Sequence, residues 1–361
     1  MPVGIHNRPG TLTAAQIRRL ARDCGFELAG VAPAEPVPEA VFFLEWVRQG
    51  MAGEMSYLTG RRAQMRLDPR SLLPTARSVI CVGKLYNTAG PSSIQATGAE
   101  QGWISRYAWG EDYHAVLRRG LERLVACLEQ QWGRFEWKIC VDTAPLLERA
   151  LARRAGLGWI GKNTCLINQP QGSWFFLGEL LVSLEIEPDC GPPPDRCGSC
   201  TRCIEACPTQ AIVPTGRPDG PAWALDSRLC ISYFTIELRG PIPEERRPDV
   251  GRHVFGCDIC QDVCPWNRKA PRSLEPAFQP AHAAPSLEEL AELSEEDFRS
   301  RFGDTPVARA RYRGFLRNVA VAMGNAGRSE FRPALERLAA HPDPLVAEHA
   351  QWALRRLEGD R

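Results

Sequence analysis

The apolar residues of the first 190 positions fall into short runs and helical faces that alternate along the chain. Thr13 and Gln16 have the spacing of a capping box, which predicts a helix that runs to about Cys24. Apolar side chains at helical spacing predict further helices over residues 39–49, 113–131 and 144–155. Short apolar runs predict strands over residues 26–31, 78–83, 137–141, 164–167 and 174–186. Because no clean βαβ repeat emerges, we expect an α+β or mixed three-layer domain over residues 1–190.

The C-terminal segment, residues 285–361, is predicted to be helical. One helix face there carries four apolar side chains: Phe315, Leu316, Val319 and Met323. Two more helices are predicted over residues 332–340 and 345–357, with a Pro-containing turn between them. This helix–turn–helix pattern resembles one HEAT-type repeat. Proline-rich sequence on both sides delimits a middle domain, residues 191–270.

The middle domain contains two cysteine runs. The first, from Cys197 to Pro208, reads Cys-x2-Cys-x2-Cys-x3-Cys-Pro, in which three thiolates bind one iron–sulfur cluster and the fourth binds a second cluster. The second run ends at Pro265 and lacks the leading cysteine, for which Cys230, the only cysteine between the runs, is the natural replacement. The spacing predicts two 4Fe–4S clusters. One would be bound by Cys197, Cys200, Cys203 and Cys264, and the other by Cys207, Cys230, Cys257 and Cys260.

Cysteine pairs at this spacing also bind zinc, or form disulfides in oxidising compartments. The proline after each run is not needed by zinc and favours the clusters. The remaining cysteines stand singly in mostly apolar sequence and are expected to be buried, inert thiols: Cys24, Cys81, Cys127, Cys140, Cys165 and Cys190. Cluster-binding thiols favour a cytoplasmic location.

Charge and hydropathy exclude some classes of protein. The formal net charge of +1 provides no global attraction to nucleic acid or to a membrane, so any such binding needs a local patch. No run approaches the ~18 apolar residues of a membrane span, and no secretory leader is recognisable. Arginines concentrate between Arg309 and Arg332 against a single acid, Glu330. They form either an ordinary solvated face or a surface for phosphates, and the charge favours the second.

Asp142 is the candidate catalytic acid. It follows a predicted strand and precedes Thr143-Ala-Pro-Leu, so burial is expected to raise its pKa into the range of a proton donor. The same sequence is also a good helix N-cap with a proline in the first turn. Periodicity leaves both interpretations open.

Two further segments are candidates for a ligand site. Aromatic and polar residues are concentrated beside a glycine over 103–114, which favours a pocket wall over an ordinary turn. Gly156-Leu-Gly-Trp-Ile-Gly161 matches the dinucleotide fingerprint Gly-x-Gly-x-x-Gly, but a helix precedes it and a strand follows it, the reverse of a Rossmann unit. We expect these glycines to allow close backbone approach by a large flat or phosphorylated ligand instead.

Several segments, taken together, resemble the epoxyqueuosine reductases. They are Arg66-Leu-Asp-Pro-Arg70, Ile104-Ser-Arg-Tyr-Ala-Trp-Gly-Glu-Asp-Tyr-His114, Val141-Asp-Thr-Ala-Pro-Leu-Leu-Glu-Arg-Ala150, Gly156-Leu-Gly-Trp-Ile-Gly-Lys-Asn163, and the cysteine runs with Arg228-Leu-Cys-Ile-Ser-Tyr233 between them. The resemblance covers nearly the whole chain in the family's order.

The resemblance implies an oxidoreductase that reduces epoxyqueuosine to queuosine at the wobble position of the tRNA anticodon. It implies a nitroreductase-like, reductive-dehalogenase-like domain that binds cobalamin, which the two clusters reload with electrons. Asp142 matches the family's proton donor. Cobalamin contacts are expected from Ser105, Arg106, Tyr107, Tyr113, His114, Asp142, Gly161, Lys162, Asn163 and Thr164. Arg311, Arg313 and Arg317 are the expected tRNA contacts.

Two other functions are compatible with parts of the sequence. One is a corrinoid reductase of a small halogenated or epoxide substrate, against which the basic helical segment counts. The other is an electron carrier without catalytic activity. The physiological electron donor is not indicated by any motif, and the lack of an apolar dimerisation stripe favours a monomer.

Overall fold

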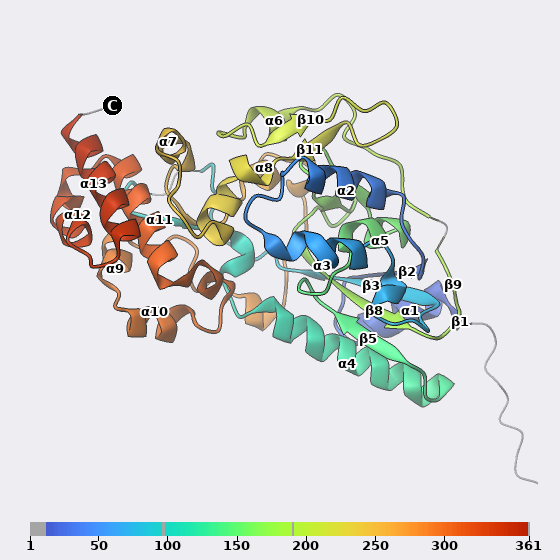
Figure 1. The fold of residues 1–361 in the computed structure, drawn as a ribbon. Helices are drawn as coiled ribbons and strands as arrows, with labels where there is room; N and C mark the ends of the chain where they lie inside the picture. The colour runs from blue at the N-terminus through green and yellow to red at the C-terminus, as the bar shows by residue number, and fades with distance from the viewer. Residues whose placement is uncertain (1–11, 96–97, 190, 360–361) are drawn as a thin grey trace, which may run out of the picture.

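The N-terminal half of the chain is organised around a four-stranded antiparallel sheet. The computed structural model describes residues 12–95, 98–189 and 191–359. The sheet has the order β2 (Leu28–Pro33), β3 (Ser78–Leu85), β8 (Phe175–Val182) and β5 (Trp137–Cys140). Every neighbouring pair is antiparallel, and β3 and β8 form its buried centre (Figure 1).

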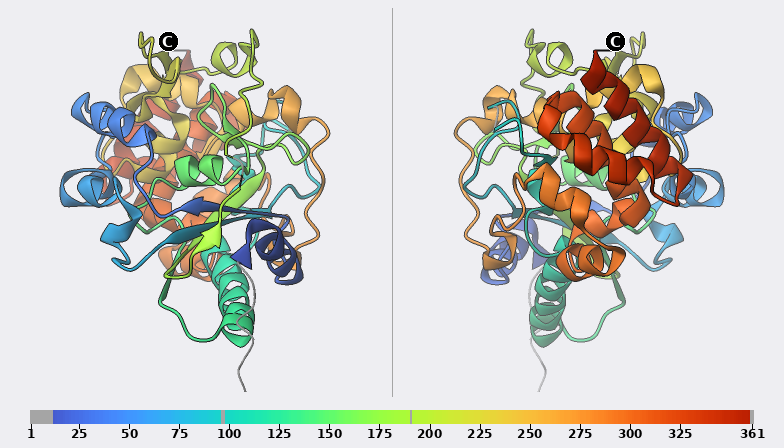
Figure 2. Two further views of the ribbon diagram at one scale, coloured as in Figure 1. Left: turned by 90° about the vertical axis from the view of Figure 1, so that its right-hand side faces the viewer. Right: turned by 90° about the vertical axis from the view of Figure 1, so that its left-hand side faces the viewer.

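Helices cover both faces of this sheet. Helices α1 (Ala14–Asp23) and α4 (Tyr113–Trp132) pack on one face, and α5 (Glu148–Arg154) packs on the other. Figure 2 (left) shows the sheet between these two layers. The predicted mixed three-layer arrangement is confirmed, as is the capping box in which the Thr13 side chain accepts from the Gln16 N–H.

The predicted helix over residues 144–155 is wrong at its start. Helix α5 begins only at Glu148, because residues 142–147 form an irregular loop that opens with Asp142 at φ +50°. Leu147 occupies the N-cap position and makes no side-chain capping bond. Asp142 is therefore not the N-cap of this helix, and the capping interpretation of its sequence is excluded.

Shorter elements complete the chain. Strands are β1 (Leu12–Thr13) with β9 (Ile186–Glu187), β6 (Trp159–Ile160) with β7 (Leu166–Ile167), β10 (Ile212–Pro214) with β11 (Trp223–Leu225), and β4 (Trp103–Ile104) with β12 (His253–Phe255). Helices are α2 (Glu39–Arg48), α3 (Gly60–Met65), α6 (Arg202–Glu205), α7 (Arg247–Val250) and α8 (Ile259–Asp262).

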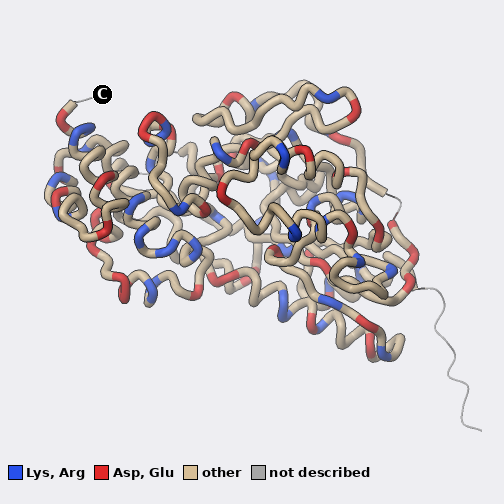
Figure 3. The backbone as a smooth tube through the Cα atoms, viewed as in Figure 1, with Lys and Arg blue, Asp and Glu red and all other residues tan. Residues whose placement is uncertain are grey.

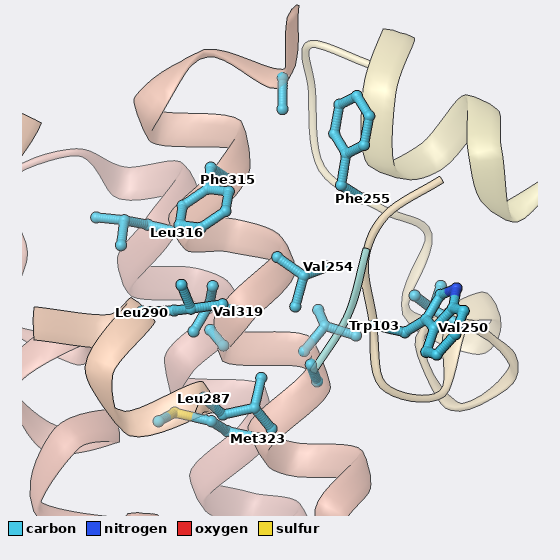
Figure 4. Packing of buried hydrophobic residues seen from close by; sticks show 14 of the residues in the cluster. Trp103, Val250, Val254, Phe255, Leu287, Leu290, Phe315, Leu316, Val319 and Met323 are labelled. Carbon is cyan, nitrogen blue, oxygen red and sulfur yellow. The ribbon is translucent and has the colours of Figure 1, made fainter. Parts of the chain in front are cut away.

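The C-terminal segment consists of helices, as predicted. They are α9 (Leu287–Glu292), α10 (Glu295–Phe302), α11 (Arg311–Ala326), α12 (Arg332–Ala339) and α13 (Pro344–Glu358). The four apolar residues predicted on one face of α11 are all buried, at 1% exposure or less. They pack against Leu287, Leu290 and Val254, as Figure 4 shows. The HEAT-type character of these helices stays a prediction.

One hydrophobic core connects the three segments of the chain. Trp103 and Ile104 of β4 share it with Phe255 of β12 and Phe315 of α11. The parallel pairing of β4 with β12 fastens the predicted pocket wall to the cysteine-containing segment. The predicted domain limits at 190, 270 and 285 stay a prediction, and packing crosses each of them. Among the described residues, no helix is both long enough and apolar enough to span a bilayer.

Candidate active site and iron–sulfur module

Asp142 lies at the C-terminal end of β5, in a loop held from two sides. Its backbone N–H donates to Glu148 Oε1 at 2.7 Å, and Arg62 Nη2 donates to the next carbonyl, that of Thr143, at 2.6 Å. The loop begins in a left-handed conformation, at Asp142. A non-glycine residue adopts this conformation only when its surroundings fix it, and these two hydrogen bonds do so. The Asp142 side chain is 41% exposed, so it is open to a ligand.

Three side chains from distant parts of the chain surround the Asp142 carboxylate. His114 Nε2 lies 3.5 Å and Arg309 Nη1 3.4 Å from Asp142 Oδ2. The Tyr113 hydroxyl is within hydrogen-bonding reach of the same carboxylate. Tyr113 stacks on the His114 ring with centroids 4.2 Å apart, and Tyr107 meets Tyr113 edge-on at 6.3 Å. Two residues at the start of α4 and one from the C-terminal segment thus converge on a single carboxylate.

The electrostatics differ from the sequence prediction. Burial pushes the pKa of the Asp142 carboxyl up, but His114, the charge of Arg309 and Tyr113 together outweigh it, and the pKa lies below its ordinary value. The expected upward shift is therefore wrong. Contacts with Asp112 and then with Asp142 raise the pKa of His114 to about 9. At neutral pH the proton of this pair resides on the imidazole.

Ser105 and Arg106, two predicted cofactor contacts, are buried and engaged within the protein. Asp258 accepts from both the Ser105 hydroxyl and the Arg106 backbone N–H. The Arg106 guanidinium donates to the carbonyls of Thr88 and Pro91. Arg106 is only 6% exposed and its guanidinium braces the segment that carries Tyr107, while its expected contact with the cofactor stays a prediction.

The segment from Gly158 to Thr164 also serves internal contacts. Lys162 Nζ donates to the carbonyls of Gly198 and Cys200, and Asn163 Nδ2 donates to that of Cys260. A Cβ on Gly158 would lie 2.2 Å from the Ile167 carbonyl oxygen, so this glycine makes room for β7 rather than for a ligand. A Cβ on Gly161 would likewise meet the Ile167 side chain, 2.5 Å away. Thr164, at φ +62°, is held by Arg149 of α5.

The cysteines of the middle segment gather in the two predicted groups. Burial is the main cause that raises the pKa of Cys203 to about 11, and the charges of Cys264, Cys197 and Cys200 add to it. Four thiols of the first set, those of Cys197, Cys200, Cys203 and Cys264, line one cavity of about 230 Å³. In the second set, burial and then the charges of Cys230 and Cys207 raise the pKa of Cys257. Contact with Cys165, burial and the charges of Cys257 and Cys230 raise the pKa of Cys260.

The six other cysteines have mixed environments. Cys24, Cys81 and Cys140 are buried as expected, and Cys127 and Cys165 are half-buried. Cys165 touches Cys260, a predicted ligand of the second cluster. Cys190 lies outside the described residues. In the described part of the chain, no three His, Cys, Asp or Glu side chains are placed to share one metal ion.

The predicted tRNA-contacting arginines divide into two kinds. Arg317 is 1% exposed and donates to the carbonyls of Phe234, Leu238 and Gly240. The prediction that Arg317 contacts tRNA is therefore wrong, because its guanidinium is buried and hydrogen-bonded to these carbonyls. Arg311 and Arg313 are exposed at the start of α11, and Arg313 pairs weakly with Asp343 at 3.5 Å.

Sequence reasoning missed four residues of the site. Arg309, Glu148 and Arg62 contact the Asp142 loop directly, and Glu179 lies behind Glu148. One signal was available, because Glu179 is the only charged residue in the apolar run of β8. A lone carboxylate in a buried strand requires a partner or a proton. The other three carry no local signal, since arginines and glutamates are common on surfaces.

Comparison with known proteins gives consistent results. A family model described as "Epoxyqueuosine reductase QueG, DUF1730" matches residues 66–143, and one described as "4Fe-4S double cluster binding domain" matches residues 196–267. The epoxyqueuosine reductase of Pseudomonas aeruginosa is 42% identical, over 95% of this chain and 94% of its own. A crystal structure of an epoxyqueuosine reductase with an epoxyqueuosine-modified tRNA-Tyr stem loop matches with TM-score 0.84 and 30% identity, covering 95% of this chain and 89% of that one.

A structure of the Bacillus subtilis epoxyqueuosine reductase also matches, with TM-score 0.83 and 30% identity, over 95% of this chain and 90% of that one. In that structure the catalytic aspartate loop is swung out of the active site. Fold and site define an iron–sulfur protein in which a double-cluster module is packed against an α+β domain with an accessible carboxylate. The identity across nearly the full length goes further, and the chain belongs to the epoxyqueuosine reductase family.

Proposed function

We propose that this protein reduces epoxyqueuosine in tRNA to queuosine. The reaction removes the epoxide oxygen as water, takes up two electrons and two protons, and leaves a carbon–carbon double bond. Family membership over 95% of the chain, at 42% identity, carries the proposal. The exposed Asp142 carboxylate, with a protonated histidine beside it, supports it chemically.

Asp142 and His114 act as the proton-delivering pair. Asp142 faces the ligand side of the site, while His114 keeps the proton at neutral pH because its pKa is raised to about 9. Proton transfer along the 3.5 Å His114–Asp142 contact would place a proton on the departing oxygen, and the second proton comes from solvent. Arg309 stabilises Asp142 as the anion between turnovers.

Cobalamin and two 4Fe–4S clusters are the proposed cofactors. When bound, cobalamin supplies a cobalt centre that accepts electrons singly and reduces the epoxide. The residues around Asp142 fit it: His114 Nε2, 3.5 Å from Asp142 Oδ2, has no closer partner among the described residues, and the Tyr107 and Tyr113 rings form an apolar wall. Gly161 and Thr164 offer backbone groups. The clusters are held by the eight cysteines predicted above, and the Lys162 and Asn163 contacts hold the cluster loops against the Gly158–Thr164 segment.

The tRNA is proposed to lie along the start of α11. Figure 3 shows basic residues grouped there, at the junction between the C-terminal helices and the rest of the chain. Arg311 and Arg313 are the exposed members and would contact phosphates. We further infer a cytoplasmic monomer that receives electrons from a separate donor, since tRNA and reduced cluster thiols are both found in the cytoplasm.

A reconstitution experiment tests the function. The full-length protein, loaded with clusters, is incubated with cobalamin, a chemical reductant and tRNA that carries epoxyqueuosine, and the nucleosides are then analysed by mass spectrometry. Conversion of epoxyqueuosine to queuosine that requires cobalamin and is lost in Asp142→Asn is expected. Conversion without cobalamin, or full turnover by Asp142→Asn, would overturn the corresponding part of the proposal.

A further inference from the structure

Glu179 is a carboxyl group at the centre of the sheet. It lies on β8 in direct register with Cys81 of β3 on one side and Cys140 of β5 on the other. The residue is 0% exposed, and neither carboxyl oxygen accepts a hydrogen bond from a donor in the described ranges. Burial of an ionised carboxylate costs free energy unless a cation or a hydrogen-bond donor compensates its charge. Ionisation of Glu179 is therefore strongly disfavoured in this place.

The carboxyl group of Glu148 is the partner. Glu148 begins α5 on the sheet face that carries Glu179: the register partners of Glu179, Cys81 and Cys140, pack in the same buried cluster as α5, and the two carboxyl groups interact there. Two carboxylates cannot bond to one another, whereas a carboxylic acid donates to a carboxylate. Burial and the neighbouring charge of Glu148 raise the pKa of Glu179 well above its ordinary value. Burial and then Asp142 raise that of Glu148 to about 7. Because Glu179 is fully buried and no donor among the described residues faces its oxygens, it is the member of the pair that keeps a proton and can donate it to Glu148.

Glu148 makes a second contact, which reaches the site. Its Oε1 accepts the backbone N–H of Asp142 at 2.7 Å, at the point where the chain enters the left-handed conformation. The chain of contacts runs from Glu179 through Glu148 to the Asp142 backbone. No other hydrogen bond to that N–H exists in the described structure.

We propose that Glu179 is a positioning residue that orients Glu148, so that Glu148 holds the Asp142 loop in its inward conformation. This rests on the proposed role of Asp142 only for its effect on turnover. In a relative the catalytic loop is swung out, so such a loop can occupy two positions. The contacts from Glu179 through Glu148 to the Asp142 backbone, called the latch below, would stabilise the inward one. Loss of the Glu179 proton places two negative charges together and releases the latch.

Other titratable and charged groups face the pair and belong to this equilibrium. They are Asp142 of the loop, Arg149 of α5, Cys81 of β3, Cys140 of β5, Tyr113 of α4 and Arg66 after α3. Cys81 and Cys140 stay neutral, because burial first and then the glutamate charges raise the pKa values of both thiols. Arg149 is engaged by Thr164, and among the described residues no cation bonds the buried Glu179 oxygens.

Hydrogen–deuterium exchange of the peptide that contains residues 141–147 tests the latch, in the full-length, cluster-loaded protein without cobalamin or tRNA. Rates are measured at several pH values between 6 and 9 and normalised to the unfolded peptide. Glu179→Gln keeps a neutral donor and is expected to retain wild-type protection at pH 6, and to lose the rise in exchange that the wild type shows as pH increases. Glu179→Leu removes the donor and is expected to exchange about tenfold faster than the wild type at pH 6, with a difference that shrinks as the pH rises.

Controls make each outcome decisive. Glu187→Gln, an exposed glutamate on β9, should leave exchange unchanged. If Glu179→Leu does not fold, the pH dependence of Glu179→Gln decides alone. Wild-type pH dependence in Glu179→Gln, or wild-type protection in a folded Glu179→Leu, overturns the proposal. In turnover, Glu179→Leu should lower kcat and leave KM for tRNA unchanged. Failure of Asp142 as proton donor would show in Asp142→Asn and leave the exchange result standing.

Discussion

Arg309 Nη1 lies 3.4 Å from Asp142 Oδ2, although the two residues are 167 positions apart in the sequence. Arg309 immediately precedes α11, whose start carries the proposed tRNA contacts, and its Nε also pairs with Glu237 at 2.8 Å. The carboxylate proposed to deliver protons is therefore in direct electrostatic contact with the segment proposed to bind the substrate. Binding of a phosphate near Arg309 would weaken this ion pair and favour protonation of Asp142.

Replacing Arg309 tests this coupling. Because the Arg309 charge lowers the pKa of Asp142, Arg309→Gln is expected to raise that pKa. The limb of the pH–rate profile that reports Asp142 should move to higher pH, measured at saturating tRNA. Arg299→Gln replaces an exposed arginine of α10 that pairs with Glu295, and this matched control should not move the limb. An unchanged profile in Arg309→Gln would show that the ion pair has no influence on catalysis.

His114 should make stability depend on pH. Its folded pKa is raised to about 9 from an unfolded value of 6.5, so the folded state binds the proton more tightly. The stabilisation is complete below pH 6.5 and is lost as the pH rises through about 9. Urea unfolding of wild type and His114→Gln should therefore give a stability difference that shrinks over this window. A difference that is constant with pH would mean that His114 is neutral in the folded protein.

Cys230 is expected to be a cluster ligand despite its distance from both runs. Cys230→Ala should lose the second cluster and about half of the bound iron, with a matching fall in visible absorbance. Cys127→Ser, a half-buried cysteine outside both groups, is the control and should retain all the iron. Full iron content in Cys230→Ala would contradict the ligand assignment.

Arg317 and Arg313, four positions apart on α11, should behave in opposite ways. Arg317→Met leaves three buried carbonyls without a donor and is expected to cost about 3–5 kcal/mol of unfolding free energy. Arg313→Gln should change stability by less than about 0.5 kcal/mol but weaken tRNA binding and flatten its salt dependence. Urea unfolding and tRNA titration at several salt concentrations measure both. Normal stability of Arg317→Met would contradict the buried role.

The sequence by itself determined much of this protein. Cysteine spacing defined two thiol groups, and the thiols of each group lie near one another in the structure. Helical spacing placed the buried face of α11, and the order of elements around Gly156 excluded a Rossmann unit. These features are local, because ligand spacing and helix periodicity are set by residues a few positions apart.

Only the tertiary structure decided what each charged group does. Arg317 and Arg313 are equivalent in sequence, and long-range packing buries one among carbonyls and leaves the other exposed. The fall in the pKa of Asp142 comes from His114 and Arg309, neither of which is near it in the chain. The Glu179–Glu148 contact joins β8 to α5 across the sheet face. Desolvation and charge–charge terms depend on three-dimensional distance, so no sequence pattern could supply them.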